Sequence, residues 1–137
     1  MTTGTTHWPA VGVAALLIFI SGAVYYGIVG DAWLAAAGLT MEQAQSANPA
    51  IYAMAALGAV CHAWFIAQLI NAFDKRSPGG GVLTACFTWG FIAFPVTAVH
   101  NAFGLKPYAL TAIDTGHTLL AFILAGLVLG AWRPKSE

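Results

Sequence analysis

Four apolar runs, each about long enough to cross a lipid bilayer, constrain the fold of this chain more than any other feature. A membrane-spanning helix needs roughly 20 mostly apolar residues. The runs cover approximately residues 8–30, 50–73, 82–103 and 109–132. Only 7% of the residues are charged and 59% are hydrophobic, whereas roughly 25% are charged in ordinary soluble domains. The sequence therefore predicts an all-α integral membrane protein, an antiparallel four-helix bundle formed by a single domain over residues 1–137.

The segment between the first and second runs is too polar and too interrupted to cross a membrane. Asp31 is a typical N-cap for a short helix through Ala37, and Gly38 is a typical residue to end that helix. Thr40 and Gln43 have the spacing of a capping box, which predicts a second short helix. We therefore expect two short interfacial helices between the first and second transmembrane helices, acting as a lid or as a simple connector.

The third run contains a proline, Pro95, near its middle. Proline cannot donate a backbone hydrogen bond, so it should free the carbonyl group of Phe91. The sequence therefore predicts a kink at this point of the third transmembrane helix.

Basic residues are distributed unevenly over the two sides of the predicted bundle. Lys75, Arg76, Arg133 and Lys135 share one side with both termini, and Lys106 is the only basic residue opposite. The positive-inside rule therefore predicts that both termini lie in the cytoplasm. A cleaved signal peptide is the competing interpretation of the first run, but no Lys or Arg precedes that run. The net charge is zero and no basic run is present, so no nucleic-acid partner is expected.

Two sets of small residues predict close helix packing. They are Ala55, Ala59, Ala63 and Ala67 in the second run, and Gly126 and Gly130 in the fourth. Small residues four apart on a membrane helix allow a second helix to approach closely. These faces predict a homo-oligomer or assembly into a larger membrane complex within the lipid bilayer.

Polar residues inside the apolar runs mark the candidate site. Asp114 is the only charged residue within such a run, and His117 follows on the same helical face. A carboxylate is costly in lipid, so it should face protein or water. Counting residues from the turns predicts one polar intramembrane site, with Tyr25 or Tyr26 at its rim. Its members are His62, His100, Asn101, Asp114 and His117.

Three interpretations of this site are open. Asp114 and a histidine can form a hydrogen-bonded pair that fixes helix register without any ligand. Alternatively, His100, Asp114 and His117 can bind a divalent metal ion or pass a proton. In the third interpretation, His62 or His117 ligates a haem or chlorophyll-type ring, so the cofactor stays unknown.

Catalytic motifs are absent from the sequence. It contains no H-E-x-x-H, G-x-S-x-G, P-loop or dinucleotide fingerprint, so an enzyme is not expected. Cys61 and Cys86 lie inside apolar runs without metal-ligand spacing, and we expect them to be buried as small hydrophobic residues.

Several short motifs follow one another along nearly the whole chain. They are Tyr-Tyr-Gly at 25–27, Gly-Asp-Ala-Trp at 30–33, Gly-Leu-Thr at 38–40, Lys-Pro at 106–107, Ile-Asp-x-Gly-His at 113–117 and Gly-Ala-Trp at 130–132. This order resembles an uncharacterised bacterial family of four-helix membrane proteins, domain of unknown function family 1761. The resemblance implies four helices in a bacterial inner membrane and no established activity. It assigns no role to His62 or His100.

Together these features predict a small inner-membrane protein without catalytic activity, either self-associating or serving as an accessory or scaffold subunit of a membrane complex. The alternative is a small transporter or channel-like protein that moves a proton, a metal ion or a small solute through the histidine and aspartate cluster. A haem-, pigment- or metal-binding membrane protein is the third possibility.

Overall fold

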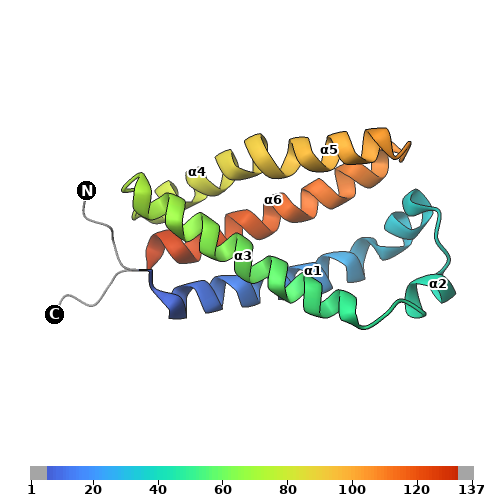
Figure 1. Cartoon of the computed structure of the whole chain (residues 1–137), viewed down its shortest axis with the longest axis horizontal. Coiled ribbons are helices and arrows are strands. Elements are labelled where there is room, and N and C mark those ends of the chain that lie inside the picture. The colour runs from blue at the N-terminus through green and yellow to red at the C-terminus, as the bar shows by residue number, and fades with distance from the viewer. Residues whose placement is uncertain (1–5, 133–137) are drawn as a thin grey trace.

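The computed structural model describes residues 6–132, which form four long antiparallel helices and one short one (Figure 1). The elements are α1 (Trp8–Ala37), α2 (Met41–Gln45), α3 (Ala50–Ala72), α4 (Pro78–Thr88), the π-helix η1 (Trp89–Ala93), α5 (Phe94–Phe103) and α6 (Tyr108–Ala131). α4, η1 and α5 form one continuous crossing, so four helices are long and apolar enough to cross a membrane. Residues 6–132 contain no strand. The all-α four-helix membrane fold is therefore confirmed, and the chain is a multi-pass membrane protein.

The first helix is longer than the sequence predicts. α1 continues without interruption through Asp31 to Ala37, so a separate short helix beginning at Asp31 is wrong. No proline interrupts this segment, and its Ala, Leu and Trp residues are compatible with continued helix. Gly38 ends α1 in the left-handed conformation at φ 72°, as expected.

The second short helix, α2, forms as predicted. The Gln43 backbone N–H donates to Thr40 Oγ1 at 3.2 Å, and the Thr40 backbone N–H donates to Gln43 Oε1 at 2.8 Å. These two bonds complete the capping box. One short helix, not two, therefore connects the first two transmembrane helices.

Near Pro95, where the sequence predicts a kink, the structure contains the π-helix η1. The Phe94 backbone N–H bonds to the carbonyl oxygen of Trp89, five residues earlier. A widened turn before proline accommodates a ring that has no N–H of its own. The third crossing thus passes through Pro95 and continues to Phe103.

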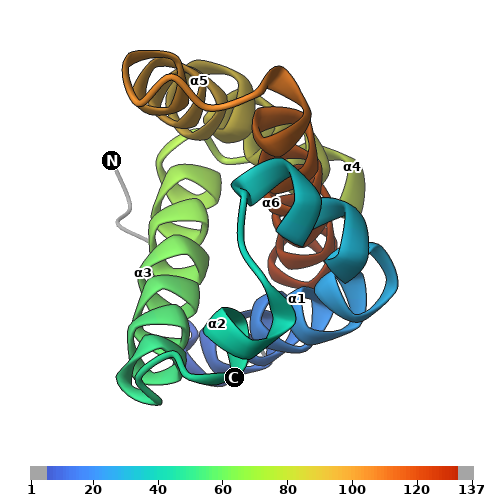
Figure 2. The ribbon, with the colours of Figure 1, turned by 90° about the vertical axis from the view of Figure 1, so that its right-hand side faces the viewer.

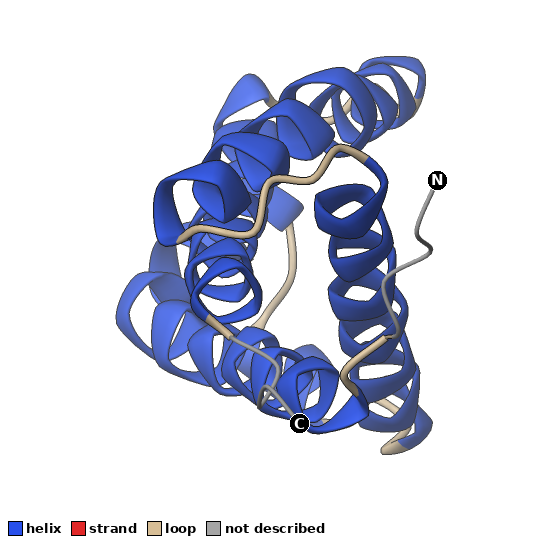
Figure 3. Ribbon diagram, turned by 90° about the vertical axis from the view of Figure 1, so that its left-hand side faces the viewer, coloured by secondary structure: helices blue, strands red, loops and turns tan. Residues whose placement is uncertain are grey.

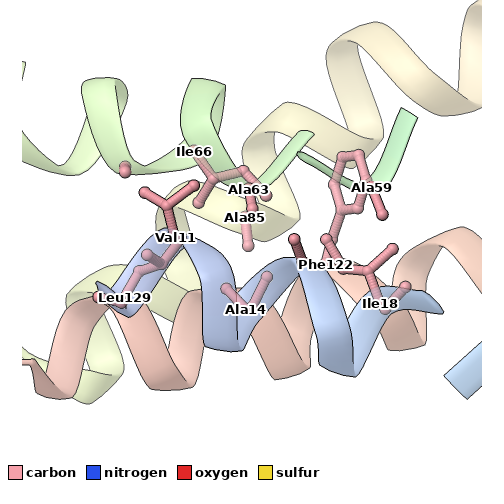
Figure 4. Packing of buried hydrophobic residues seen from close by; sticks show 14 of the residues in the cluster. Val11, Ala14, Ile18, Ala59, Ala63, Ile66, Ala85, Phe122 and Leu129 are labelled. Atoms are coloured by element: carbon pink, nitrogen blue, oxygen red, sulfur yellow. The ribbon is translucent and has the colours of Figure 1, made fainter. Parts of the chain in front are cut away.

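The buried core lies where α1, α3, α4 and α6 meet, and small residues dominate it (Figure 4). Ala59, Ala63 and Ala67 are buried there, so most of the predicted alanine stripe packs inside the chain. Ala55, at the start of that stripe, is exposed. Alanine at these positions lets the α3 backbone come close to its neighbours.

Gly126 and Gly130 are also used within the chain, because α6 packs closely on α4. A Cβ atom on Gly81 of α4 would collide with the carbonyl oxygen of Gly126. A Cβ atom on Gly130 would collide with the carbonyl oxygen of Ser77. The glycine face of α6 therefore packs closely against α4 within the same chain.

The two ends of the bundle differ. The terminal end holds the start of α1, the end of α6 and the turn between α3 and α4 (Figure 1). The far end holds α2 and the turn between α5 and α6, and there α3 stands apart from α5 (Figure 2). Figure 3 views the molecule from the terminal end and shows helices joined by loops. Residues 50–57, the first part of α3, are all exposed, whereas its second half carries the buried residues.

The two cysteines are free. Cys61 lies exposed on α3 and Cys86 is half-buried in α4, so the prediction that both are buried is wrong. In a membrane-spanning helix an exposed position faces lipid, and a small thiol is compatible with that surface.

Candidate functional site

The carboxylate of Asp114 is held by two aromatic side chains of α1. Tyr26 Oη donates a hydrogen bond to Asp114 Oδ1 at 2.9 Å, and Trp33 Nε1 donates to the same oxygen at 3.0 Å. Tyr26 and Trp33 are seven residues apart, which places them on one face of α1 two turns from each other. We call these three residues the Asp114 clasp. It ties the far half of α1 to the first turns of α6.

Tyr25 makes a second connection between the same two helices. Its hydroxyl group donates to the backbone carbonyl of Ile113 at 3.1 Å. A Cβ atom on Gly116 would lie 3.0 Å from that hydroxyl oxygen. Glycine at position 116 therefore leaves the room that the Tyr25 side chain occupies.

His117 packs against both tyrosines, one helical turn beyond Asp114. Its ring centroid lies 5.5 Å from that of Tyr25 and 5.2 Å from that of Tyr26. A Cβ atom on Gly22 would lie 3.3 Å from His117 Nε2, so glycine allows the imidazole to approach the α1 backbone. Within residues 6–132, this Nε2 is the one buried side-chain polar atom without a hydrogen-bond partner. A buried polar atom without a partner lowers the free energy of unfolding by about 1–3 kcal/mol.

The second carboxylate oxygen of Asp114 differs from the first. Oδ1 accepts both bonds from α1. Oδ2 accepts neither of the two bonds from α1. Both hydrogen bonds of the clasp therefore converge on one oxygen of the carboxyl group, and Oδ2 takes no part in it.

The other predicted site residues lie elsewhere. His100 is exposed on α5, and Asn101 Nδ2 donates to Thr111 Oγ1 at 3.1 Å, which ties α5 to α6. His62 is exposed on α3, with its ring centroid 5.1 Å from that of Phe122. The structure therefore brings Asp114 and His117 together with the tyrosines but separates them from His62 and His100.

The predicted metal group is not assembled. Among residues 6–132, no three His, Cys, Asp or Glu side chains are arranged to hold a metal ion. His100, Asp114 and His117 were expected at similar membrane depth, but depth does not fix the direction in which a helix presents a side chain. His100 is presented at the surface instead.

Three contributors were missed from the sequence: Trp33, Gly22 and Gly116. Trp33 donates to Asp114 only because α1 continues past residue 30, where the sequence predicted its end. Its spacing of seven residues from Tyr26 is the signal that indicates a shared face. The two glycines give no comparable signal, since their role appears only when α1 and α6 are placed side by side.

Comparison with known proteins identifies a family for this chain. A family model described as "Protein of unknown function (DUF1761)" matches residues 9–130, nearly the whole chain. No curated protein and no solved structure matches. The tyrosine pair at 25–26 and the Asp-x-Gly-His motif at 114–117, on which the resemblance depends, are the segments that face each other across α1 and α6.

Proposed function

Because the chain belongs to the family described as protein of unknown function DUF1761, we propose its role from its geometry alone. The protein is a non-catalytic subunit of a bacterial inner membrane that associates with a second copy of itself and serves as a scaffold. The exposed position of His62 at mid-membrane depth carries this proposal. The Asp114 clasp is then the device that fixes α1 against α6.

His62 is placed where an imidazole lacks water. It lies twelve residues after the start of α3, or about 18 Å along the helix axis. It is exposed, and it packs on the ring of Phe122, which offers no hydrogen bond to either imidazole nitrogen. Polar groups in the hydrocarbon core need partners from protein. A second chain supplies such a partner.

The surface around His62 is suited to a close helix contact. Ile51, Ala55, Gly58 and His62 are spaced by four, three and four residues, which places them on one face of α3. Ala55 is exposed, and a Cβ atom on Gly58 would meet nothing within 4 Å. Small residues at membrane interfaces allow helix backbones to approach, and polar residues there form bonds between helices. We call these four residues the α3 face.

The charge distribution supports the proposed orientation. Lys75 and Arg76 lie in the turn at the terminal end, whereas Lys106 lies in the turn at the far end. Arg133 and Lys135 fall outside the described residues. By the positive-inside rule, the excess of positive charge at the terminal end supports a cytoplasmic position of both termini.

To test association, copies of the protein that carry donor or acceptor fluorophores are mixed in lipid vesicles. Energy transfer between the copies is measured as the protein-to-lipid ratio is varied. Gly58→Leu adds bulk to the α3 face at a position where a Cβ atom would meet nothing within 4 Å. Gly12→Leu is the matched control, because Gly12 is exposed on α1 and also has nothing within 4 Å of a Cβ atom. We expect Gly58→Leu to weaken association about tenfold or more and Gly12→Leu to leave it unchanged.

His62→Leu separates the hydrogen bond from the packing. Interhelical hydrogen bonds in membranes contribute about 0.6–2 kcal/mol, so association should weaken by roughly 3- to 30-fold. A protein that stays monomeric at all densities would contradict the proposal. A coloured protein whose absorption bands disappear in His62→Leu would also contradict it, and would assign His62 to a haem or pigment.

A second candidate function is proton movement through the far half of the bundle. It is favoured by the position of the Asp114 carboxyl group, whose Oδ2 takes no part in the clasp, one helical turn from the unpaired Nε2 of His117. In vesicles with an imposed pH gradient, Asp114→Asn would abolish proton flux while it retains an oxygen for the clasp. Equal flux with the wild-type protein and Asp114→Asn would exclude this function.

A further inference from the structure

A small cavity at the terminal end has a lining that differs from the rest of the bundle. It has a volume of about 30 Å³ and lies between the starts or ends of α1, α3 and α6. Part of its lining consists of buried core residues such as Ala10, Ile70 and Leu129. The polar residues that line it are His7, Asn71, Arg76 and Trp132.

These four polar residues come from four different parts of the chain, and local bonds fix two of them. Thr6 Oγ1 donates to Gln68 Oε1 at 2.8 Å, which holds the segment before α1 against α3 and so places His7. The turn after α3 is fixed by the Lys75 backbone N–H, which bonds to the Ile70 carbonyl at 2.9 Å. Arg76 follows directly. The cavity is therefore assembled by the fold and not by one flexible segment.

The lining is rich in hydrogen-bond donors. A guanidinium group carries five N–H donors and no acceptor, and an indole has a donor only. An amide and an imidazole add further N–H groups. None of the described residues that line the cavity is Asp or Glu. Such a lining attracts an anion that has several acceptor oxygens, and Arg76 matches phosphate geometry in particular.

The cavity also lies at the level of the lipid headgroups. His7 immediately precedes α1, Arg76 lies in the turn between α3 and α4, and Trp132 directly follows α6. Ends of transmembrane helices lie at the membrane interface, where tryptophan is enriched and phospholipid phosphates are found. An anion at this place needs no passage through the hydrocarbon core.

We propose that this cavity binds a phosphate group, which is supplied either by a phospholipid headgroup or by inorganic phosphate. One water needs about 10–15 Å³ of such space, so about 30 Å³ admits the oxygens on one side of a phosphate but not a nucleotide. Arg76 carries the charge, and the side chains of Asn71, His7 and Trp132 add neutral donors. The assignment is independent of the α3 face and of the Asp114 clasp.

The test uses the full-length protein in detergent, stripped of lipid by extensive washing. Phosphatidylglycerol and, separately, inorganic phosphate are added, and bound ligand is measured by native mass spectrometry and by ³¹P NMR. Arg76→Gln removes the proposed charge. Lys75→Gln is the matched control, because Lys75 is in the same turn but lines a different groove, between α3 and α4. Thermal unfolding of both variants checks that they are folded.

We expect binding to be about tenfold or more weaker in Arg76→Gln and unchanged in Lys75→Gln, because a charge-assisted contact is lost in only one of them. Binding of phosphatidylglycerol alone identifies a lipid source, and binding of inorganic phosphate identifies a phosphate site open to either source. Equal weakening in the two variants would show general attraction to a basic turn and overturn the proposal. Absence of binding for both probes would overturn it as well.

Discussion

Asp114 accepts two hydrogen bonds from α1 on one oxygen, so two substitutions at this position separate its charge from its role as an acceptor. Asp114→Asn keeps an acceptor oxygen, whereas Asp114→Leu leaves Tyr26 Oη and Trp33 Nε1 without a partner. We expect Asp114→Leu to lower the free energy of unfolding by about 1–3 kcal/mol. Asp114→Asn should lower it much less. Unfolding in mixed micelles measures both, and equal losses would show that the clasp does not depend on its acceptor.

Replacing His117 is predicted to affect the free energy of unfolding in the opposite direction. Its Nε2 is buried without a partner, so the free energy of unfolding should be unchanged or higher by about 1 kcal/mol in His117→Leu. Leucine fills a similar space beside the two tyrosine rings. A loss of more than about 2 kcal/mol would mean that the imidazole has a stabilising partner. If stability rises while proton flux or association falls, the unpaired nitrogen is kept for function.

At the scale of the elements, the contact between α4 and α6 depends on glycine. A Cβ atom on Gly81 would collide with the backbone of α6 at Gly126, and a backbone atom cannot rotate away. Gly79, also in α4, has nothing within 4 Å of a Cβ atom and supplies the control. We expect Gly81→Ala to cost about 2–3 kcal/mol of the free energy of unfolding, because overpacking forces the backbones apart. Gly79→Ala should be neutral or slightly stabilising, and equal effects would contradict the packing.

The end of α5 carries a residue in an unfavourable conformation. Leu105 has φ 52°, and the Lys106 backbone N–H next to it bonds to the Asn101 carbonyl at 2.9 Å. This left-handed position usually holds glycine, and other residues lose about 1–2 kcal/mol there. Leu105 is 92% exposed, so it contributes little packing. We therefore expect Leu105→Gly to raise the free energy of unfolding by up to about 1 kcal/mol, and a decrease would contradict this.

Most elements could be predicted from the sequence because helix signals are local. The four apolar runs, the end of α1 at Gly38 and the capping box at Thr40 all depend on residues close together in the chain. The break expected near Gly30 was wrong because a glycine lowers helix propensity without stopping a helix, and α1 continues until Gly38 ends it. That error alone removed Trp33 from the expected site.

At the scale of the whole molecule, residue counting predicts depth but not which helices are neighbours. Asp114 and His117 take their side-chain contacts from α1, whereas the sequence also predicted histidines of α3 and α5 beside them. The sequence likewise indicated small-residue faces without showing what covers them. Most of the alanine stripe and the two glycines of α6 proved to be covered inside the chain, whereas the start of α3, with Ala55, is exposed.

The α3 face gives the most direct test of the proposed association. Single cysteines are introduced along α3 after the two native cysteines have been replaced by serine, and disulfide formation between copies is measured in native membranes. Ile51→Cys, Ala55→Cys and Gly58→Cys lie on the face, whereas Ala53→Cys and Leu57→Cys point away from it. We predict strong crosslinking at the first three positions and weak crosslinking at the other two. Uniform crosslinking along α3, or none at any position, would contradict the account.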